Sequence, residues 1–247
     1  MWIFGYGSLL WYTDFPYVRA VPGYVEDYVR RFWQASPDHR GTNENPGRTV
    51  TLVPTPGGKA YGIAYQVEVS QAPSIRAYLN WREKAGYEVK TVRFHPESSD
   101  QDLTPFDLEV YLANLDNNPY YTGGEPISVI AEKVLECHGE SGSNIAYVLR
   151  VARRSRELFP QLEDDHLSAV EQAVLQLCRQ RQVPDPVLLE LNYLTPEEYN
   201  SWTAAAATRK SESANGHGQT QTATAPSVLV NGVGVGVEEK TVEPVNS

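Results

Sequence analysis

The chain has 247 residues, of which 41% are hydrophobic, and a formal net charge of −10. This length suits one large domain or two small ones with a core, and the negative charge argues against nucleic acid or an anionic membrane as the main partner. The cysteines, Cys137 and Cys178, form no CxxC motif, so we predict neither a disulfide framework nor a zinc site. No stretch approaches the roughly 18 apolar residues of a membrane span, and no signal peptide is recognisable, which predicts a soluble cytosolic protein.

The first residues predict a short strand that runs into a glycine loop. The apolar start is followed by Gly5-Tyr6-Gly7-Ser8, whose glycines permit backbone angles closed to other residues. Successive N–H groups of such a loop can face one point, which makes it a candidate site for an anion or a polarised carbonyl. The spacing fits no dinucleotide, P-loop or nucleophile-elbow motif, so a turn without a ligand remains the alternative.

The order of strand and helix signals favours a mixed α+β fold. Strand-like composition or alternation recurs in residues 48–53, 60–67 and 106–112. We predict a hairpin connection at Pro54–Gly58, between two of these strands. Amphipathic helical stripes follow at residues 127–135, 145–152 and 167–177. Strands first and helices later indicate a sheet curled toward a barrel, with helices beside it.

Changes in amino-acid composition divide the chain into three parts. Residues 1–182 are the predicted folded domain, and residues 183–202 are a proline-containing extension with one short helix near Pro196. Residues 203–247 consist mainly of Ala, Thr, Ser, Asn, Gly and Val. Because such a composition cannot build a core, we predict a disordered low-complexity tail.

A helix predicted within residues 72–87 carries an unusual carboxylate. Gly86 suits the end of this helix, and Glu83 takes the next position on its apolar stripe, in the predicted last turn. Partial burial and the negative end of the helix dipole both raise a carboxyl pKa. Such a residue is either neutralised by Arg82 or Lys84, or it is a base tuned toward neutral pH. The pattern alone leaves both interpretations open.

Four groups of residues, taken together, form a specific pattern. They are Gly5-Tyr6-Gly7-Ser8-Leu9, then Arg31-Phe32-Trp33-Gln34 with Asp38-His39-Arg40-Gly41, then Pro46-Gly47-Arg48-Thr49-Val50-Thr51-Leu52, and Arg82-Glu83-Lys84-Ala85-Gly86-Tyr87. This pattern resembles the ChaC family of glutathione-specific γ-glutamylcyclotransferases over about residues 1–182, with Ala85 departing from the family's usual glycine. The resemblance implies a small mixed β-barrel of the γ-glutamylcyclotransferase-like type with flanking helices. It also implies cleavage of glutathione to 5-oxoproline and cysteinylglycine in the cytosol, without a metal or cofactor.

The resemblance also implies which residues act. It places the general base at Glu83 and the substrate loop at Ile3 to Ser8. The predicted substrate-binding residues are Ile3, Phe4, Gly5, Tyr6, Gly7, Ser8, Leu9, Arg40, Arg48 and Tyr147. The N–H groups from Tyr6 to Leu9 are candidate donors to the substrate carbonyl.

Other residues carry weaker cases. Arg40 and Arg48 are candidates to grip a substrate carboxylate, with solvated loop charges as the alternative. Tyr147 matches a family tyrosine, although a core tyrosine fits nearly as well. We expect His39 to order its loop and Glu88, the rival base, to lie on a strand in solvent.

Two alternatives to glutathione cleavage stay open. One is the same ring closure on other γ-glutamyl peptides or amines, and the other is a catalytically silent module that binds γ-glutamyl ligands. An intact Glu83 beside an intact loop speaks against the silent module, because a binder gains nothing from a costly carboxylate. The predicted partner is a small-molecule substrate, with no nucleic acid and no membrane, and the sequence predicts no oligomeric state.

Overall fold

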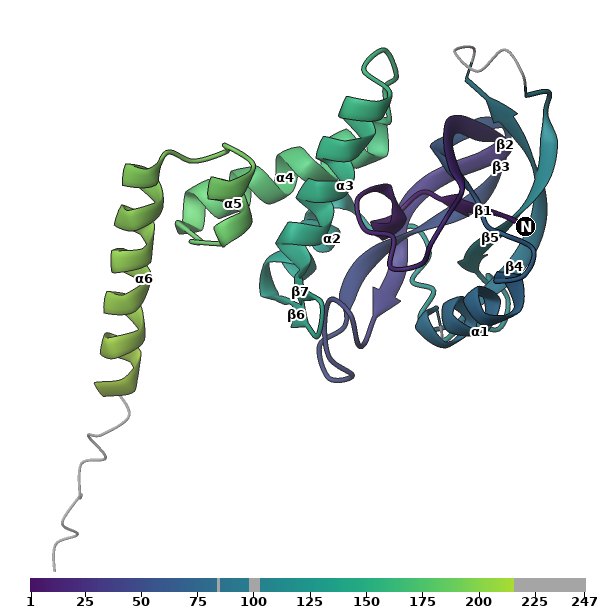
Figure 1. Ribbon diagram of the computed structural model, residues 1–247. Helices are drawn as coiled ribbons and strands as arrows, with labels where there is room; N and C mark the ends of the chain where they lie inside the picture. Colours follow the sequence, from purple (N-terminus) through teal and green to yellow (C-terminus); the bar gives the residue numbers. More distant parts are fainter. Residues whose placement is uncertain (84, 98–102, 216–247) are drawn as a thin grey trace, which may run out of the picture. The chain divides into compact units, whose positions relative to one another are not determined.

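Five strands close into a mixed barrel, which confirms the predicted fold class (Figure 1). The computed structural model describes residues 1–83, 85–97 and 103–215 of the chain. The strands are β1 (Trp2–Gly5), β2 (Arg19–Ser36), β3 (Gly47–Gln66), β4 (Tyr87–Pro96) and β5 (Phe106–Ala113). Their order around the barrel is β1-β3-β2-β4-β5. Neighbouring strands are antiparallel, except β1 and β5, which pair in parallel and close the barrel.

Alternation along the strands places apolar side chains inside the barrel. On β5, Leu108, Val110 and Leu112 are buried, as their spacing predicts. The largest fully buried side chains from the strands include Phe4, Phe32, Phe94 and Leu52. Residues 62–65 of β3 are buried without interruption, so this part of β3 is covered on both of its faces.

The predicted hairpin at Pro54–Gly58 is wrong, because β3 runs through this segment. Strand β3 pairs with β2 on both sides of it, with Tyr28 opposite Pro54 and Glu26 opposite Lys59. Between these pairs the register shifts, and the carboxylate of Asp27 accepts the N–H of Gly57 at 2.8 Å. The turn-forming residues therefore make a bulge in a long two-stranded ribbon. Pairing with β2 on either side outweighs the local turn signal.

The helices are α1 (Ala72–Arg82), α2 (Ile127–Glu136), α3 (Asn144–Leu158), α4 (Asp165–Arg181), α5 (Pro186–Glu190) and α6 (Pro196–Asn215), with a 3-10 turn η1 (Ser8–Leu10) and a small ribbon of β6 (His138–Gly139) and β7 (Gly142–Ser143). Of these helices, α2, α3 and α4 contact the barrel strands and match the predicted stripes. Ser143 caps α3 by accepting the N–H of Ala146 at 3.0 Å, and Asp164 caps α4 in the same way through Leu167 at 3.0 Å. Helix α3 contacts β3, η1 and α4, and residues 144–149 of it are buried.

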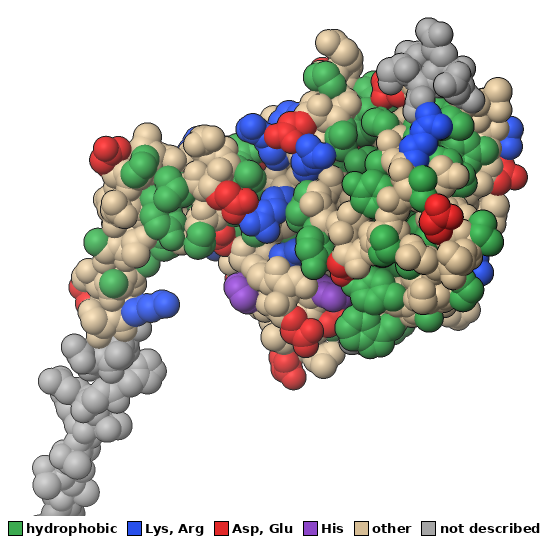
Figure 2. Space-filling view, in the orientation of Figure 1, with side chains coloured by type: hydrophobic (Ala, Val, Ile, Leu, Met, Phe, Trp, Pro, Cys, Tyr) green, Lys and Arg blue, Asp and Glu red, His purple; other side chains and the backbone are tan. Residues whose placement is uncertain are grey.

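Ion pairs cover the outer face of α3. Arg150 pairs with Glu190 at 2.7 Å, and Arg153 and Arg154 pair with Glu157 at 2.6 and 2.9 Å. In Figure 2, blue and red side chains lie interspersed over this region. Among the residues that the structure describes, no helix has the length and apolar character needed to cross a bilayer.

The C-terminal part of the described chain is more ordered than the sequence predicts. Val187 and Leu188 of α5 are almost fully buried and join the core, together with Leu194. Disorder is wrong for residues 203–215, because they continue α6. The run of alanines at 204–207 has high helix propensity, which a composition-based reading underrates. The rest of the predicted tail, residues 216–247, lies outside the described residues.

Truncation tests where the stable domain ends. Deleting residues 183–247 removes three buried aliphatic side chains, each of which stabilises the fold by about 1.5–3 kcal/mol when buried, so Tm should fall by several degrees or more. Deleting residues 209–247, beyond the compact unit Met1–Thr208, should leave Tm nearly unchanged. Thermal unfolding followed by circular dichroism distinguishes the two truncations. An unchanged Tm in the shorter protein would contradict the packing of α5 on the core.

Candidate active site

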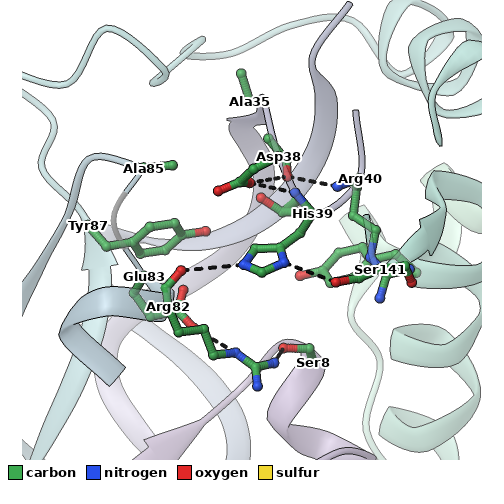
Figure 3. A pocket seen from close by; sticks show the side chains of 13 residues that line it. Ser8, Ala35, Asp38, His39, Arg40, Arg82, Glu83, Ala85, Tyr87 and Ser141 are labelled. Carbon is green, nitrogen blue, oxygen red and sulfur yellow. Dashed lines mark hydrogen bonds and ion pairs between the residues drawn. The ribbon is translucent and has the colours of Figure 1, made fainter. Parts of the chain in front are cut away.

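A cleft lies where the end of α1, η1, the segment after β2 and the start of α3 meet (Figure 3). Its inner part is lined by Phe4, Tyr6, Gly7, Ser8, Leu9, Val50, Leu79, Glu83, Tyr87, Tyr111 and Tyr147. Its middle part shares Ser8, Glu83, Tyr87 and Tyr147 with the inner part and adds residues such as His39 and Arg40. The outer part adds Trp11, Tyr12, Asp14, Tyr78, Trp81 and Arg150. The shared lining residues place these three parts next to one another.

The end of α1 places Glu83 in the cleft. The helix ends at Arg82, before the predicted stop at Gly86, and Glu83 is its C-cap residue, whose N–H donates to the carbonyl of Leu79 at 2.8 Å. Gly86 then takes a positive φ of 79°, and a Cβ there would lie 2.0 Å from Oδ1 of Asn118. Only glycine fits this turn, which returns the chain from α1 into β4. The side chain of Glu83 is left 23% exposed.

The surroundings of Glu83 favour its protonated form. Burial raises the pKa of the Glu83 carboxyl above its usual range, and Asp38 and Asp14 raise it further, while Arg82 and His39 lower it. The Nε of Arg82 lies 3.6 Å from Oε1 of Glu83. Arg82 therefore pairs with Glu83, as one interpretation of the sequence pattern predicts, but the carboxyl still binds protons more tightly than usual. The other predicted neutralising residue, Lys84, lies outside the described residues.

The glycine loop forms the wall opposite Glu83. Ser8 begins η1, and because the first N–H groups of a 3-10 turn have no acceptor within it, those of Ser8 and Leu9 are left for other partners. A Cβ on Gly7 would come within 3.0 Å of the Tyr147 hydroxyl, so glycine allows this close approach. Of the predicted loop residues, Phe4 and Tyr6 to Leu9 line the cleft, whereas Ile3 and Gly5 are buried in β1, where they pair with β3.

Buried phenols surround the carboxylate. Tyr147 accepts the N–H of Val50 at 3.2 Å, and Tyr87 donates to the carbonyl of Val50 at 2.9 Å. Burial raises the pKa of Tyr147 to about 12 and that of Tyr87 well above its usual value of 10. Both therefore stay neutral at physiological pH, and the Tyr147 hydroxyl keeps its proton free to donate. Sequence reasoning missed Tyr87, although it follows Gly86 directly in the quoted pattern.

The structure separates the two candidate arginines. Arg40 lines the cleft, donates to the carbonyls of Ser141 at 2.6 Å and Ser143 at 3.3 Å, and lies over the ring of Tyr147. Within residues 1–83, 85–97 and 103–215, no carboxylate pairs with it. Arg48 instead forms a two-point pair with Glu125, with distances of 2.7 and 2.9 Å, and does not line the cleft. A buried guanidinium without a counter-ion is costly, so Arg40 is prepared for an anion and Arg48 is not.

His39 and Glu88 also differ in their relation to the cleft. The ring of His39 lies in the cleft, between Ser141 and the end of α1 (Figure 3), with Nδ1 3.0 Å from the Ser141 hydroxyl. Glu88 pairs on β4 with Lys90 at 2.9 Å and accepts from Asn114 at 2.9 Å, away from the cleft. In the described part of the chain, no group of three or more His, Cys, Asp or Glu side chains is placed to hold a metal ion.

Comparisons with known proteins agree with this geometry. Residues 1–177 match the sequence profile of the family described as ChaC-like protein. The chain belongs to this family. Similar ChaC-like relatives include glutathione-specific gamma-glutamylcyclotransferase 1 of Rattus norvegicus, 45% identical over 177 residues, and that of Homo sapiens, 43% identical over 176 residues. Each of these two alignments covers 70% of this chain and 78% of the relative.

A solved structure shares the fold. The crystal structure of a selenomethionine-labelled γ-glutamyl cyclotransferase specific to glutathione from yeast superposes with a TM-score of 0.67 at 28% identity. It covers 71% of this chain and 96% of the yeast chain. The two chains therefore share their fold over nearly the whole length of the yeast protein.

The raised pKa of Glu83 predicts a pH-dependent effect on stability. Because the folded state binds a proton at Glu83 more tightly than the unfolded chain does, ionisation at neutral pH opposes folding. Glu83→Gln removes this cost and should raise Tm at pH 7. The gain should vanish as the pH falls toward about 4.3, the pKa of an unfolded glutamate. Thermal unfolding over a pH series measures it.

The matched control for this prediction is Glu88→Gln. This residue is paired with Lys90 and Asn114, so its replacement should not raise Tm at any pH. A Glu83→Gln protein that is less stable than the parent at pH 7 would contradict the raised pKa.

Proposed function

We propose that this chain is an enzyme, a γ-glutamylcyclotransferase that cleaves glutathione into 5-oxoproline and cysteinylglycine. The observation that carries the proposal is the partly buried Glu83 carboxylate, which faces the Tyr6–Leu9 loop across one cleft. The fold and the ChaC-like relatives, which are named glutathione-specific gamma-glutamylcyclotransferases, support the same reaction. The products make the enzyme a lyase.

The reaction needs a base and no nucleophilic side chain. The α-amine of the γ-glutamyl group attacks its own γ-carbonyl, so that a C–N bond forms within a five-membered ring and the amide C–N bond breaks. Glu83 takes the amine proton and returns it to the departing nitrogen of cysteinylglycine. Because the attack is intramolecular, holding the substrate in a folded shape contributes on the order of 7–11 kcal/mol. A carboxylate with a raised pKa suits both proton transfers.

The loop provides the complementary electrostatics. As the γ-carbonyl is attacked, negative charge develops on its oxygen, and the N–H groups of the Tyr6–Leu9 segment would stabilise that charge. Tyr147 has a neutral hydroxyl at the same wall and is a further donor. Losing one such donor typically costs about 2.7–4 kcal/mol. In this scheme Ile3 and Gly5 do not touch the substrate but hold the loop through β1.

Arg40 gives the substrate its direction. With the γ-glutamyl half at Glu83, in the inner part of the cleft, cysteinylglycine extends toward the outer part, where Arg40 and Arg150 lie. The glycine carboxylate would supply the counter-ion that Arg40 lacks among the described residues. This contact would favour glutathione over γ-glutamyl amines, which have no carboxylate at that end. A silent binding module is disfavoured, because binding alone does not require Glu83 to be buried.

A cytosolic location is part of the proposal. Cys137 and Cys178 are both buried and free, which fits a reducing compartment.

The first test concerns the base. Glu83→Gln keeps the shape of the side chain and removes its basicity, so kcat should fall by about 10²–10⁴ while glutathione still binds. Release of 5-oxoproline from glutathione by the purified protein is the measurement. Glu88→Gln, the matched control, should change kcat little. Near-normal turnover by Glu83→Gln would refute the assignment of the base.

The second test concerns substrate selection. Arg40→Met should lower kcat/KM for glutathione by the equivalent of about 1.5–3 kcal/mol, the usual worth of a charge-assisted hydrogen bond. The same variant should handle glutathione amidated at its glycine carboxylate about as well as the parent protein does. Arg48→Met is the control, and any loss it causes should be equal for both substrates, because Arg48 is held by Glu125. Equal losses for Arg40→Met as well would mean that Arg40 supports only the fold.

A further inference from the structure

Arg82 joins three segments of the chain at the cleft. Its Nη1 donates to both carboxylate oxygens of Asp14, at 3.0 and 2.9 Å, and its Nη2 donates to the hydroxyl of Ser8 at 3.0 Å. Tyr78, one turn earlier on α1, also contacts Asp14. The side chain of Arg82 is only 12% exposed, and its Nε faces the carboxylate of Glu83 at 3.6 Å. Figure 3 shows it extending from the end of α1 to Ser8.

These contacts address a geometric requirement of the proposed reaction. The base and the loop that faces it come from parts of the chain 74 residues apart, as measured from Ser8 to Arg82. The amine and the carbonyl of the substrate must be held together between them, and misplacement by about 1 Å can cost roughly 100-fold in rate. Ser8 belongs to a single 3-10 turn, which has few internal hydrogen bonds of its own.

We propose that Arg82 is a positioning residue, which fixes the Ser8 loop against the helix end that carries Glu83 and holds a positive charge beside that base. The inference rests on the proposed function of the cleft. Arginine suits this role because its planar guanidinium presents separate nitrogens to three groups, Nη1 to Asp14, Nη2 to Ser8 and Nε to Glu83, whereas the lysine ammonium has a single nitrogen. Asp14 holds the guanidinium at Nη1, and Nε faces the base.

Arg82 affects the base through its positive charge as well as through the contacts that position it. The groups that face Glu83 are Arg82 and His39, which favour its ionised form, and Asp38 and Asp14, which oppose it. The phenols of Tyr6, Tyr87 and Tyr147 are also close, and burial keeps them neutral. Glu83 must be ionised to accept the amine proton, so kcat/KM falls as the pH drops through its pKa. Removing the guanidinium charge raises that pKa and moves the acid limb of the profile to higher pH.

Substitutions at Arg82 separate the charge from the contacts. Arg82→Lys keeps the charge and loses the fork, so kcat should fall roughly 10- to 100-fold with little movement of the acid limb. Arg82→Met loses both, so kcat should fall at least as far and the acid limb should move to higher pH. The control, Arg76→Met, lies on the same helix and removes an exposed pair with Glu109 away from the cleft, so both readouts should match the parent.

Asp14→Asn adds a test in which the acid limb of the pH profile is not expected to move to higher pH. It weakens the contact that holds Arg82, so kcat should fall, but the cation stays on the chain and the removal of the negative charge of Asp14 by itself lowers the pKa of Glu83. The acid limb should stay in place or move to lower pH. This variant and Arg82→Lys carry the test if Arg82→Met does not fold.

The outcomes distinguish the inference from the function on which it rests. An Arg82→Met protein with a lowered Tm and an unmoved acid limb would reduce Arg82 to a structural role. A parental kcat in Arg82→Lys and Asp14→Asn would overturn the positioning role. A fully active Glu83→Gln protein would instead refute the proposed base and leave the Arg82 contacts without a catalytic meaning.

Discussion

The fold must hold the carboxylate of Glu83 at the end of α1, where burial and the helix dipole both oppose its ionisation. The neighbouring features follow from this constraint. Gly86, with its positive φ, lets the chain leave the helix at once, so that Glu83 stays at the cleft. Arg82 and His39 offset part of the electrostatic cost without removing it. A carboxylate left with a raised pKa costs stability, and it is the state that a base working near neutral pH requires.

The fold brings residues from distant segments of the chain together around the cleft. The loop at η1 follows β1, and His39 and Arg40 lie in the connection between β2 and β3. Arg82 and Glu83 lie at the end of α1, and Tyr147 lies near the start of α3. Glu83 lies in the inner part of the cleft, and Arg40, which has no carboxylate partner among the described residues, lies toward the outer part. In the proposed orientation this order matches the substrate, whose reacting amine lies at one end and whose glycine carboxylate lies at the other. Complementary charge at both ends gives direction as well as affinity.

Local patterns predicted much of this architecture, and long-range contacts explain what they did not predict. Alternation on β5 and the stripes of α2 to α4 reflect periodicities that a sequence shows directly. The bulge at Pro54–Gly58 depends on pairing with β2 on either side, which no local turn signal reveals. The break in the apolar stripe marked Glu83 as an unusual carboxylate, and the resemblance to the ChaC family made it the predicted base. Arg40 and Arg48 look equivalent in sequence. They differ because Arg48 is paired with Glu125, which lies 77 residues away in the chain. The contacts of Arg82 with Ser8 and Asp14 also join residues far apart in the chain, so local patterns did not predict them.

The buried charges that line the cleft differ from those elsewhere in the fold in how well they are paired. Away from the cleft, buried charges are matched, as in the pair of Arg48 with Glu125 and that of Arg156 with Glu171. Arg30 is also buried, but it donates to Ser155 and to the carbonyl of Tyr61 and lies 3.8 Å from Asp164. Arg40 and Glu83 differ, because one bonds only to carbonyls among the described residues and the other keeps a raised pKa despite its arginine. Both face the same cleft, and a single zwitterionic ligand would relieve both, since its cation would lie at the acid and its anion at the arginine.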